Sequence, residues 1–269
     1  MRKVSRWFQR NLIRIYAGVA FTYLFIPVAY TFAFSFNDSR KSNLVWQGFT
    51  LENWQNPCGA PEICTALGNS IKIGFLATLF STILGTMIAF AIGRYHFKGR
   101  STTNLLIFLP MATPEIVLGA SLLSLFLVFQ INPGFWPTVI AHVLFCVSFV
   151  VVTVKARIAS LDPRLEQAAM DLYANERETF RRVTLPLVAP GIAAAALLAF
   201  SLSFDDFIIT NFNAGTVNTF PKFVWVSSAR GVPAQANVIG SAMFLIALAI
   251  VVSAQIYSSA KARRLQKKH

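Results

Sequence analysis

Long apolar segments recur along this chain, and they constrain its fold more than any other feature of the sequence. A helix needs about 20 mostly apolar residues to cross the hydrocarbon core of a bilayer. Six segments meet this length, and we expect spans at about 12–34, 67–92, 105–130, 134–157, 187–213 and 235–258. Only 13% of the residues are charged, against about 25% in soluble domains. The sequence therefore predicts an all-α integral membrane protein, with residues 1–269 forming one transmembrane domain, rather than a soluble two-domain protein.

The basic residues are distributed unevenly between the two sides of this predicted topology. The N-terminal segment, the loop after the second span, the segment after the fourth span and the C-terminal tail hold five, three, six and five lysines and arginines. The opposite side holds four, namely Arg40, Lys41, Lys222 and Arg230. Because basic loops stay in the cytoplasm, both termini of this multi-pass chain are predicted to be cytoplasmic. Topology thus accounts for the net charge of +13, and a nucleic-acid partner is not needed to explain it.

The longest polar stretch on the cytoplasmic side, residues 158–186, is predicted to form two short helices. Asp162 is a plausible N-cap, with Pro163 at the first helical position. Asn175 begins a second helix and has Glu178 three residues later, which is a capping-box spacing. We expect this second helix to end at the prolines of "LPLVAPG", which interrupt helical hydrogen bonding.

The first of these helices is amphipathic, and its pattern leaves two interpretations open. Leu165, Ala168, Ala169 and Leu172 recur at helical spacing on one face. Such a helix can be a connector that lies on the membrane surface. It can also be a docking element whose apolar face fills a groove on another protein.

The segment "EQAAMDLYANERETFRRVTLP" resembles the EAA loop of ABC importer permeases. That loop reads Glu-Ala-Ala, three residues, Gly, about nine residues, an aliphatic residue, one further residue and Leu-Pro. Gln167, Ala168 and Ala169 match its first three positions, and Val183 precedes a matching Leu185-Pro186. Two residues depart from the pattern: Gln167 replaces the glutamate, although Glu166 is adjacent, and Tyr173 replaces the glycine. A glycine suits a left-handed turn, so either Tyr173 tolerates that conformation or the turn differs here.

Further segments resemble the spermidine/putrescine branch of these permeases. They are "WQGFTLENW", "LGNSIKIGFLATLFSTILGTMIAF", "RYHFKGR", "PMATPEIVLG" and "FSLSFDDFIITNF". The resemblance implies a MetI-like permease fold in the cytoplasmic membrane, surrounded by lipid. It also implies a complex with a second permease subunit, two cytoplasmic ABC ATPases and an extracytoplasmic substrate-binding protein.

In such a complex the EAA loop couples the permease to the ATPase. The resemblance assigns this contact to Leu165, Glu166, Gln167, Ala168, Ala169, Leu172, Tyr173, Phe180, Leu185 and Pro186. The chain contains no G-x-x-x-x-G-K-[ST] phosphate loop. We therefore expect that it is not itself an enzyme and holds no cofactor, with ATP and Mg²⁺ bound by the partner ATPases.

Three acidic residues fall inside predicted spans, where charge is costly. Stepping by three and four along a continuous helix places Asp206 on a polar stripe with Ser203 and Thr210, whereas Asp205 has mostly apolar neighbours. We therefore expect Asp206 to face a hydrated pathway, and Asp205 to lie at a helix contact or the pathway edge. Glu115 follows Pro114, which favours a kink. Structural ion pairs are the alternative role for these acids.

Several acids with few buried bases favour a cationic solute. A polyamine site needs spaced carboxylates and aromatic walls, for which Phe207 and Trp136 are candidates, although both can also serve as packing or interfacial residues. The predicted function is the permease subunit of an ATP-driven importer of spermidine or putrescine. The alternatives are a permease for another small cationic or polar solute, and a stand-alone cation channel or secondary transporter, which would not need the EAA loop.

The three cysteines do not have the spacing of a zinc or haem site, and we expect no metal site. Cys58 and Cys64 lie in a predicted outer loop, where disulfides persist, and the intervening Gly59 and Pro61 let the chain turn back. They form either a disulfide or two free thiols. Cys146, in the fourth span, is expected to be a small buried hydrophobic residue.

Overall fold

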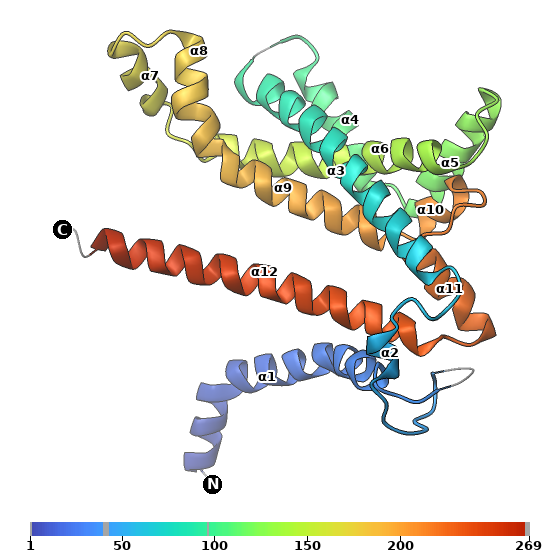
Figure 1. Cartoon of the computed structure of the whole chain (residues 1–269). Coiled ribbons are helices and arrows are strands. Elements are labelled where there is room, and N and C mark those ends of the chain that lie inside the picture. The colour runs from blue at the N-terminus through green and yellow to red at the C-terminus, as the bar shows by residue number, and fades with distance from the viewer. Residues whose placement is uncertain (1, 40–42, 96, 267–269) are drawn as a thin grey trace. The chain divides into compact units, whose positions relative to one another are not determined.

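The computed structural model describes residues 2–39, 43–95 and 97–266, and the described residues confirm the predicted all-α fold. Arg40 and Lys41, two of the four basic residues predicted on the outer side, lie outside the described residues. An isolated bridge between Asn37 and Phe49 is also present. In chain order, the helices (Figure 1) are α1 (Arg2–Phe34), α2 (Glu52–Gln55), α3 (Ile63–Arg94), α4 (Arg100–Ala112), α5 (Glu115–Val128), α6 (Phe135–Ala159), α7 (Arg164–Asp171), α8 (Glu176–Thr179), the π-helical η1 (Phe180–Thr184), α9 (Leu185–Asp205), α10 (Ile208–Asn213), α11 (Phe220–Arg230) and α12 (Ala234–Gln266).

Five helical segments of the described chain are long and apolar enough to cross a membrane, and a bent pair brings the number to six. The bent pair is α4 with α5, whose axes differ by 106°, so the third predicted span is not one straight helix. The cause is Pro114, which disfavours helical geometry at the preceding residue. Thr113 is accordingly extended, with φ −80° and ψ 132°. The kink expected at this proline is therefore a complete break.

Two further boundaries differ from those predicted. The second cytoplasmic helix does not end at "LPLVAPG", because α8, η1 and α9 follow one another from Glu176 to Asp205. Pro186 lies in the first turn of α9, where its missing N–H is tolerated, and the wider π-helical turn precedes it. The fifth predicted span, 187–213, is interrupted between Asp205 and Ile208, although no proline or glycine lies there.

The chain divides into two compact units, which we describe separately: Met1–Cys64 with Val224–His269, and Thr65–Phe223. In the second unit α6 and α9 run side by side (Figure 1). α3 approaches α6 closely at Gly85, where an added Cβ would lie 2.7 Å from Val150 Cγ1. The core of this unit consists of Ala89, Phe126, Ala141, Phe145, Cys146, Val150, Val151, Val154, Val188, Ala195, Ala199 and Ile209.

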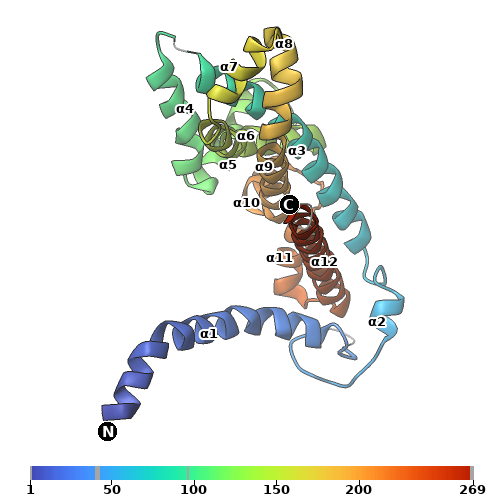
Figure 2. The same cartoon turned by 90° about the vertical axis from the view of Figure 1, so that its left-hand side faces the viewer.

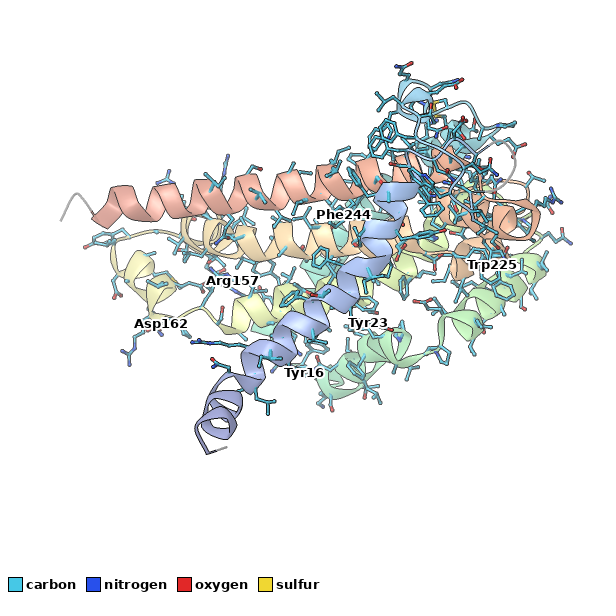
Figure 3. The ribbon with its side chains drawn as sticks, turned by 90° about the horizontal axis from the view of Figure 1, so that it is seen from below. Tyr16, Tyr23, Arg157, Asp162, Trp225 and Phe244 are labelled. Atoms are coloured by element: carbon cyan, nitrogen blue, oxygen red, sulfur yellow. A yellow bond between two sulfur atoms is a disulfide. The ribbon has the colours of Figure 1, made fainter. Side chains whose placement is uncertain are left out.

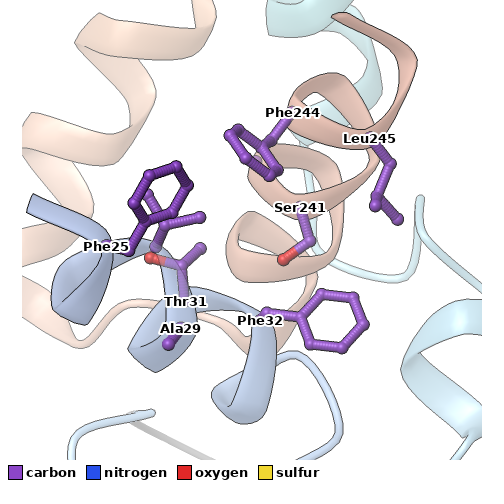
Figure 4. Close-up of a pocket in the computed structure, with 9 residues that line it drawn as sticks. Phe25, Ala29, Thr31, Phe32, Ser241, Phe244 and Leu245 are labelled. Carbon is purple, nitrogen blue, oxygen red and sulfur yellow. The ribbon is translucent and has the colours of Figure 1, made fainter. Parts of the chain in front are cut away.

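In the first unit α1 packs against α12. An apolar pocket lies between these helices, with Phe25 and Phe32 on one side and Ser241 and Phe244 on the other (Figure 4). The chain between α1 and α2 is held by amide side chains: Asn37 Nδ2 donates to Asn43 Oδ1 at 2.6 Å, and Asn53 Nδ2 donates to the carbonyl oxygen of Asn37 at 2.9 Å. These bonds join described polar residues that lie between α1 and α3.

Candidate functional site

The loop after α6 forms the two helices that the sequence predicts. Asp162 Oδ1 accepts the backbone N–H of Arg164 at 2.9 Å and so supports the start of α7, although the N-cap position falls at Pro163, one residue later than expected. Asn175 and Glu178 form the predicted capping box: Glu178 N–H donates to Asn175 Oδ1 at 2.9 Å, and Asn175 N–H donates to Glu178 Oε2 at 3.3 Å. α7 and α8 lie together at one end of the second unit (Figure 2), and Asp162 lies beyond Arg157 at the end of α6 (Figure 3).

Tyr173 adopts the left-handed conformation that the family's glycine would suit, with φ +65°. Its N–H donates to the carbonyl oxygen of Met170 at 3.0 Å, and the N–H of Ala174 donates to that of Ala169 at 3.2 Å. This pair of bonds is the Schellman motif that closes many helices. The tyrosine side chain is 99% exposed, so no neighbouring side chain opposes the turn, and the cost of the left-handed backbone is borne by the residue itself. The backbone geometry expected of the EAA loop is therefore present despite the substitution.

Glu166 ties α7 to the ends of two spans. Its carboxylate pairs with Arg94, at the end of α3, and Oε1 accepts the hydroxyl of Thr184 at 2.6 Å. Arg94 Nη2 also donates to Thr184 Oγ1 at 3.3 Å. Gln167, at the position of the family's glutamate, is exposed. The acid that fastens this loop to its own spans is therefore Glu166.

The residues predicted to contact an ATPase divide into two groups. Leu165, Ala168, Leu172 and Tyr173 are exposed, and Leu172 is 81% exposed. Ala169 is partly buried. The other group also takes part in the chain's own packing: Phe180, although 38% exposed, packs edge-on against Phe90 with the ring centroids 5.2 Å apart, and Leu185 with Pro186 begins α9. The exposed group forms an apolar surface on and just after α7, which we call the α7 surface.

The interruption of the fifth span is built around Asp206. Its backbone is extended, with φ −66° and ψ 125°. Its carboxylate accepts the N–H of Thr210 at 2.8 Å and that of Ile209 at 3.2 Å, and the Thr210 hydroxyl at 3.0 Å. These are N–H groups of the first turn of α10, which have no acceptor within their own helix. Asp206 therefore closes the start of α10 in the way an N-cap residue does.

His142 of α6 completes this polar cluster. It is 1% exposed. Its Nδ1 lies 2.6 Å from Ser203 Oγ, and its Nε2 lies 2.9 Å from Thr210 Oγ1 and 3.3 Å from Asp206 Oδ2. The residues expected on one polar stripe are thus brought together, but around a buried histidine and across a helix break. We call His142, Ser203, Asp206 and Thr210 the His142 cluster.

The exposure of the two aspartates is the reverse of that expected from a continuous helix. Asp206 is 8% exposed, whereas Asp205 is exposed. The helical-step argument fails here because the helix ends at Asp205 and the chain changes direction. Glu115 is exposed at the start of α5 and interacts electrostatically with both aspartates. α10 packs against α5, where an added Cβ at Gly119 would lie 3.0 Å from Phe212 Cδ2, so the helix that follows the two aspartates lies beside the helix that begins with Glu115.

The two aromatic candidates occupy different surroundings. Phe207 lies in the break itself and is partly buried, and Trp136 lies in the first turn of α6 and is 61% exposed.

His142 was not predicted from the sequence. The available signal was a histidine flanked by apolar residues within a span, in "VIAHVLF", which is a polar group that needs buried partners.

The structure joins Cys58 to Cys64, in the first turn of α3, by a disulfide, the first of the two alternatives that the sequence left open. The enclosed turn contains Glu62 in a left-handed conformation, with φ +65°. Cys146 is a buried free cysteine, as expected.

Comparison with known proteins assigns the chain to a family. Residues 71–267 match the family described as binding-protein-dependent transport system inner membrane component. The chain is 34% identical to the spermidine/putrescine transport system permease protein PotC of Haemophilus influenzae over 254 residues, covering 94% of this chain and 97% of that protein. It is also 34% identical to the putrescine transport system permease protein PotI of Escherichia coli, covering 91% of this chain and 90% of that protein.

Solved structures show the same fold. A bacterial ABC transporter involved in the import of the acidic polysaccharide alginate matches with a TM-score of 0.66 at 15% identity, covering 93% of this chain and 96% of that one. The MetNI methionine ABC transporter matches with a TM-score of 0.55 at 15% identity, covering 72% of this chain and 94% of that one. The matched segment contains both the loop and the broken spans described above, and the chain belongs to the family of binding-protein-dependent transport system inner membrane components.

Proposed function

We propose that this protein is the permease subunit of an ABC importer that carries spermidine or putrescine into the cell. The observation that carries the proposal is its similarity to polyamine permeases, which extends over 94% of this chain and 97% of the Haemophilus influenzae relative. Two features of the chain agree with a polycationic solute: three acids lie within the spans, on helices that pack together or at the break between them, and two of these acids, Glu115 and Asp205, are exposed.

The solute path in this proposal uses exposed carboxylates as successive contacts. Opposite unit charges about 4 Å apart attract by roughly 4 kcal/mol at an effective dielectric of 20. Such a contact is strong enough to hold an ammonium group, and a series of them lets the solute move onward. We assign direct contact to Glu115 and Asp205, and the support of their geometry to Asp206, Ser203 and Thr210. Phe207 and Trp136 would provide aromatic faces for the amine groups.

The proposed complex contains a second permease subunit, two cytoplasmic ABC ATPases and an extracytoplasmic substrate-binding protein. The α7 surface is the proposed contact with an ATPase, and its exposed leucine and tyrosine suit a groove on a partner. ATP and Mg²⁺ would bind to the ATPases, since the sequence has no phosphate loop of its own. This arrangement requires both termini of the chain to be cytoplasmic.

The deciding experiment is uptake of radiolabelled spermidine and putrescine by the complete complex in proteoliposomes, with ATP on the ATPase side and the binding protein on the other. We expect uptake that requires ATP and is competed by unlabelled polyamine, but not by a neutral sugar. Uptake of a different small cation or polar solute, with none of either polyamine, would contradict the proposed substrate. Flux through the isolated chain without an ATPase would favour a channel or secondary transporter.

A further inference from the structure

The break between α9 and α10 has no proline or glycine to cause it. The residues across it are Phe204, Asp205, Asp206, Phe207 and Ile208. In a continuous helix the N–H groups of Ile209 and Thr210 would donate to the carbonyl oxygens of Asp205 and Asp206. Here they donate to the side chain of Asp206 instead. Where no proline or glycine is present, a sharp break needs a side chain inserted into the helical hydrogen bonds. This break therefore depends on how the Asp206 carboxylate is held.

The hydrogen-bond partners of His142 explain how the Asp206 carboxylate is held. A neutral imidazole has one donor and one acceptor. The Thr210 hydroxyl donates to Asp206 Oδ2 at 3.0 Å, so its oxygen can accept from His142 Nε2 at 2.9 Å. With the proton on Nε2, Nδ1 accepts from the Ser203 hydroxyl, whose oxygen lies 2.6 Å away. Each of these polar groups then has a partner, and the Nε2–H tautomer satisfies the whole cluster.

The same ring therefore contacts the last turns of α9, the break and the first turn of α10. Ser203 belongs to α9, Asp206 to the break and Thr210 to α10, whereas His142 belongs to α6. α6 packs along α9 and also against α10, so it provides a fixed reference for both helices. A buried carboxylate without partners would be strongly disfavoured at this depth.

We propose that His142 is a positioning residue that holds the α9–α10 break in place and thereby presents Asp205, the last residue of α9, to the solute path. The ring touches Asp206 and Thr210 and acts on Asp205 through them. The part of the proposal that concerns transport rests on the function proposed above. The part that concerns the break does not.

The test separates the two nitrogens of the ring. In His142→Asn the amide can replace Nδ1 and reach Ser203, whereas in His142→Gln it can replace Nε2 and reach Thr210 and Asp206. Since the Nε2 side holds the break, we expect His142→Gln to keep most of the maximal rate of polyamine uptake and His142→Asn to lose about tenfold, which is the effect of one hydrogen bond to a charged group. Ser148→Ala, at another buried polar residue of α6, is the matched control and should be unchanged.

A second measurement reads the break without relying on transport. In the assembled complex carrying Asp205→Cys, the rate of labelling by a charged thiol reagent reports the exposure of position 205, because Cys146 is buried and Cys58 is bonded to Cys64. Adding His142→Asn should change that rate about tenfold, and adding His142→Gln should leave it near the starting value. Equal labelling and equal uptake in the two variants would overturn the proposal. A complex that imports no polyamine, yet shows the labelling difference, would contradict the proposed function alone.

Discussion

At the scale of single residues, two adjacent aspartates have different surroundings because the helix ends between them. Asp205 is exposed, and Asp206 is buried with its oxygens turned toward backbone N–H groups and a histidine. The insertion cost of a carboxylate in a span, roughly 2.5–3.5 kcal/mol, therefore has a different explanation at each position. At Asp206 this cost is offset by hydrogen bonds from the first-turn N–H groups of α10. At Asp205 exposure to a hydrated path is the proposed reason.

This difference predicts opposite consequences for two substitutions. Asp205→Asn should lower polyamine uptake strongly while the complex assembles and melts normally. The substitution removes the negative charge but breaks no bond that holds the break in place. Asp206→Ala should destabilise the chain by about 1–2 kcal/mol, because it leaves the first turn of α10 without its acceptor. Uptake assays together with thermal melting of the purified complex measure both effects.

Asp206→Asn is the control, since its amide oxygen can still accept from the backbone. It should be more stable than Asp206→Ala. Full uptake by Asp205→Asn, together with loss of uptake in a stable Asp206→Asn complex, would show that the buried aspartate is the solute contact.

Tyr173 gives a second prediction at this scale. Its left-handed backbone costs a non-glycine residue about 1–2 kcal/mol, and its side chain is exposed. Tyr173→Gly should therefore keep transport and leave the complex at least as stable. Tyr173→Val should destabilise the loop, because a branched Cβ is poorly tolerated at positive φ. Limited proteolysis of the loop in the two variants would show the difference, and greater cleavage in Tyr173→Gly than in Tyr173→Val would contradict it.

At the scale of elements, one side of the cytoplasmic loop contacts the chain's own spans, and the other side is exposed. Glu166 fastens α7 to Arg94 and Thr184, and Phe180 fastens η1 to α3 through Phe90. The side chains of the α7 surface, on the other side, are exposed. An element fastened in this way can transmit movement of a bound partner to α3 and α9 directly.

A charge placed on the α7 surface should therefore uncouple the complex without unfolding the chain. Leu172→Asp tests this more directly than Ala169→Asp, because Leu172 is largely exposed and Ala169 is partly buried. We expect Leu172→Asp to insert normally but to lose copurification of the ATPase or solute-stimulated ATP hydrolysis. Ser160→Asp, at an exposed position between α6 and α7 and off the α7 surface, is the control. Wild-type uptake by Leu172→Asp would remove the coupling role from this surface.

The elements that could be predicted from the sequence are those fixed by local chemistry. Asn175 with Glu178 caps α8, and Asp162 supports the start of α7, because a side chain and a backbone N–H three or fewer residues apart decide the outcome. Pro114 likewise indicated the irregularity of the third span, although not its 106° extent. The break at Asp206 could not be predicted in this way. It depends on His142, which is 64 residues away in the chain and meets Asp206 only after α6 packs on α9.

At the scale of the whole molecule, the distribution of basic residues and the disulfide agree on one topology. The disulfide lies in the loop that the charge pattern places outside the cytoplasm, where such bonds persist. The α7 surface belongs to the segment that connects α6 to α9 in the chain. The same charge pattern places this segment in the cytoplasm. The proposed binding-protein and ATPase partners would then meet opposite ends of the spans.

The topology predicts which introduced cysteines a membrane-impermeant maleimide will label in intact cells. A cysteine replacing Lys222, on the predicted outer side, should be labelled. A cysteine replacing Arg164, in the cytoplasmic loop, should be labelled only after the membrane is permeabilised. Labelling of position 164 in intact cells would reverse the assigned orientation.

The disulfide gives a prediction for stability. It closes a short loop, for which the chain-entropy relation gives a stabilisation of about 2 kcal/mol. The double variant Cys58→Ser/Cys64→Ser should therefore melt at a lower temperature than the wild type, and reduction of the wild type should reproduce this shift. Alkylation of both thiols in the unreduced wild-type protein would show that the bond does not form.

The two interrupted spans each contain a second helix start, and each start has an acid beside it. Aligned peptide dipoles give a helix start a partial positive charge, about half an elementary charge for a regular helix. In transporters with interrupted helices, such ends can attract an anionic solute directly. Here Glu115 is the first residue of α5, and the carboxylate of Asp206 lies over the first turn of α10. The chain thus supplies its own anion at each helix start, and the positive end that would repel a polyamine is neutralised before the solute arrives.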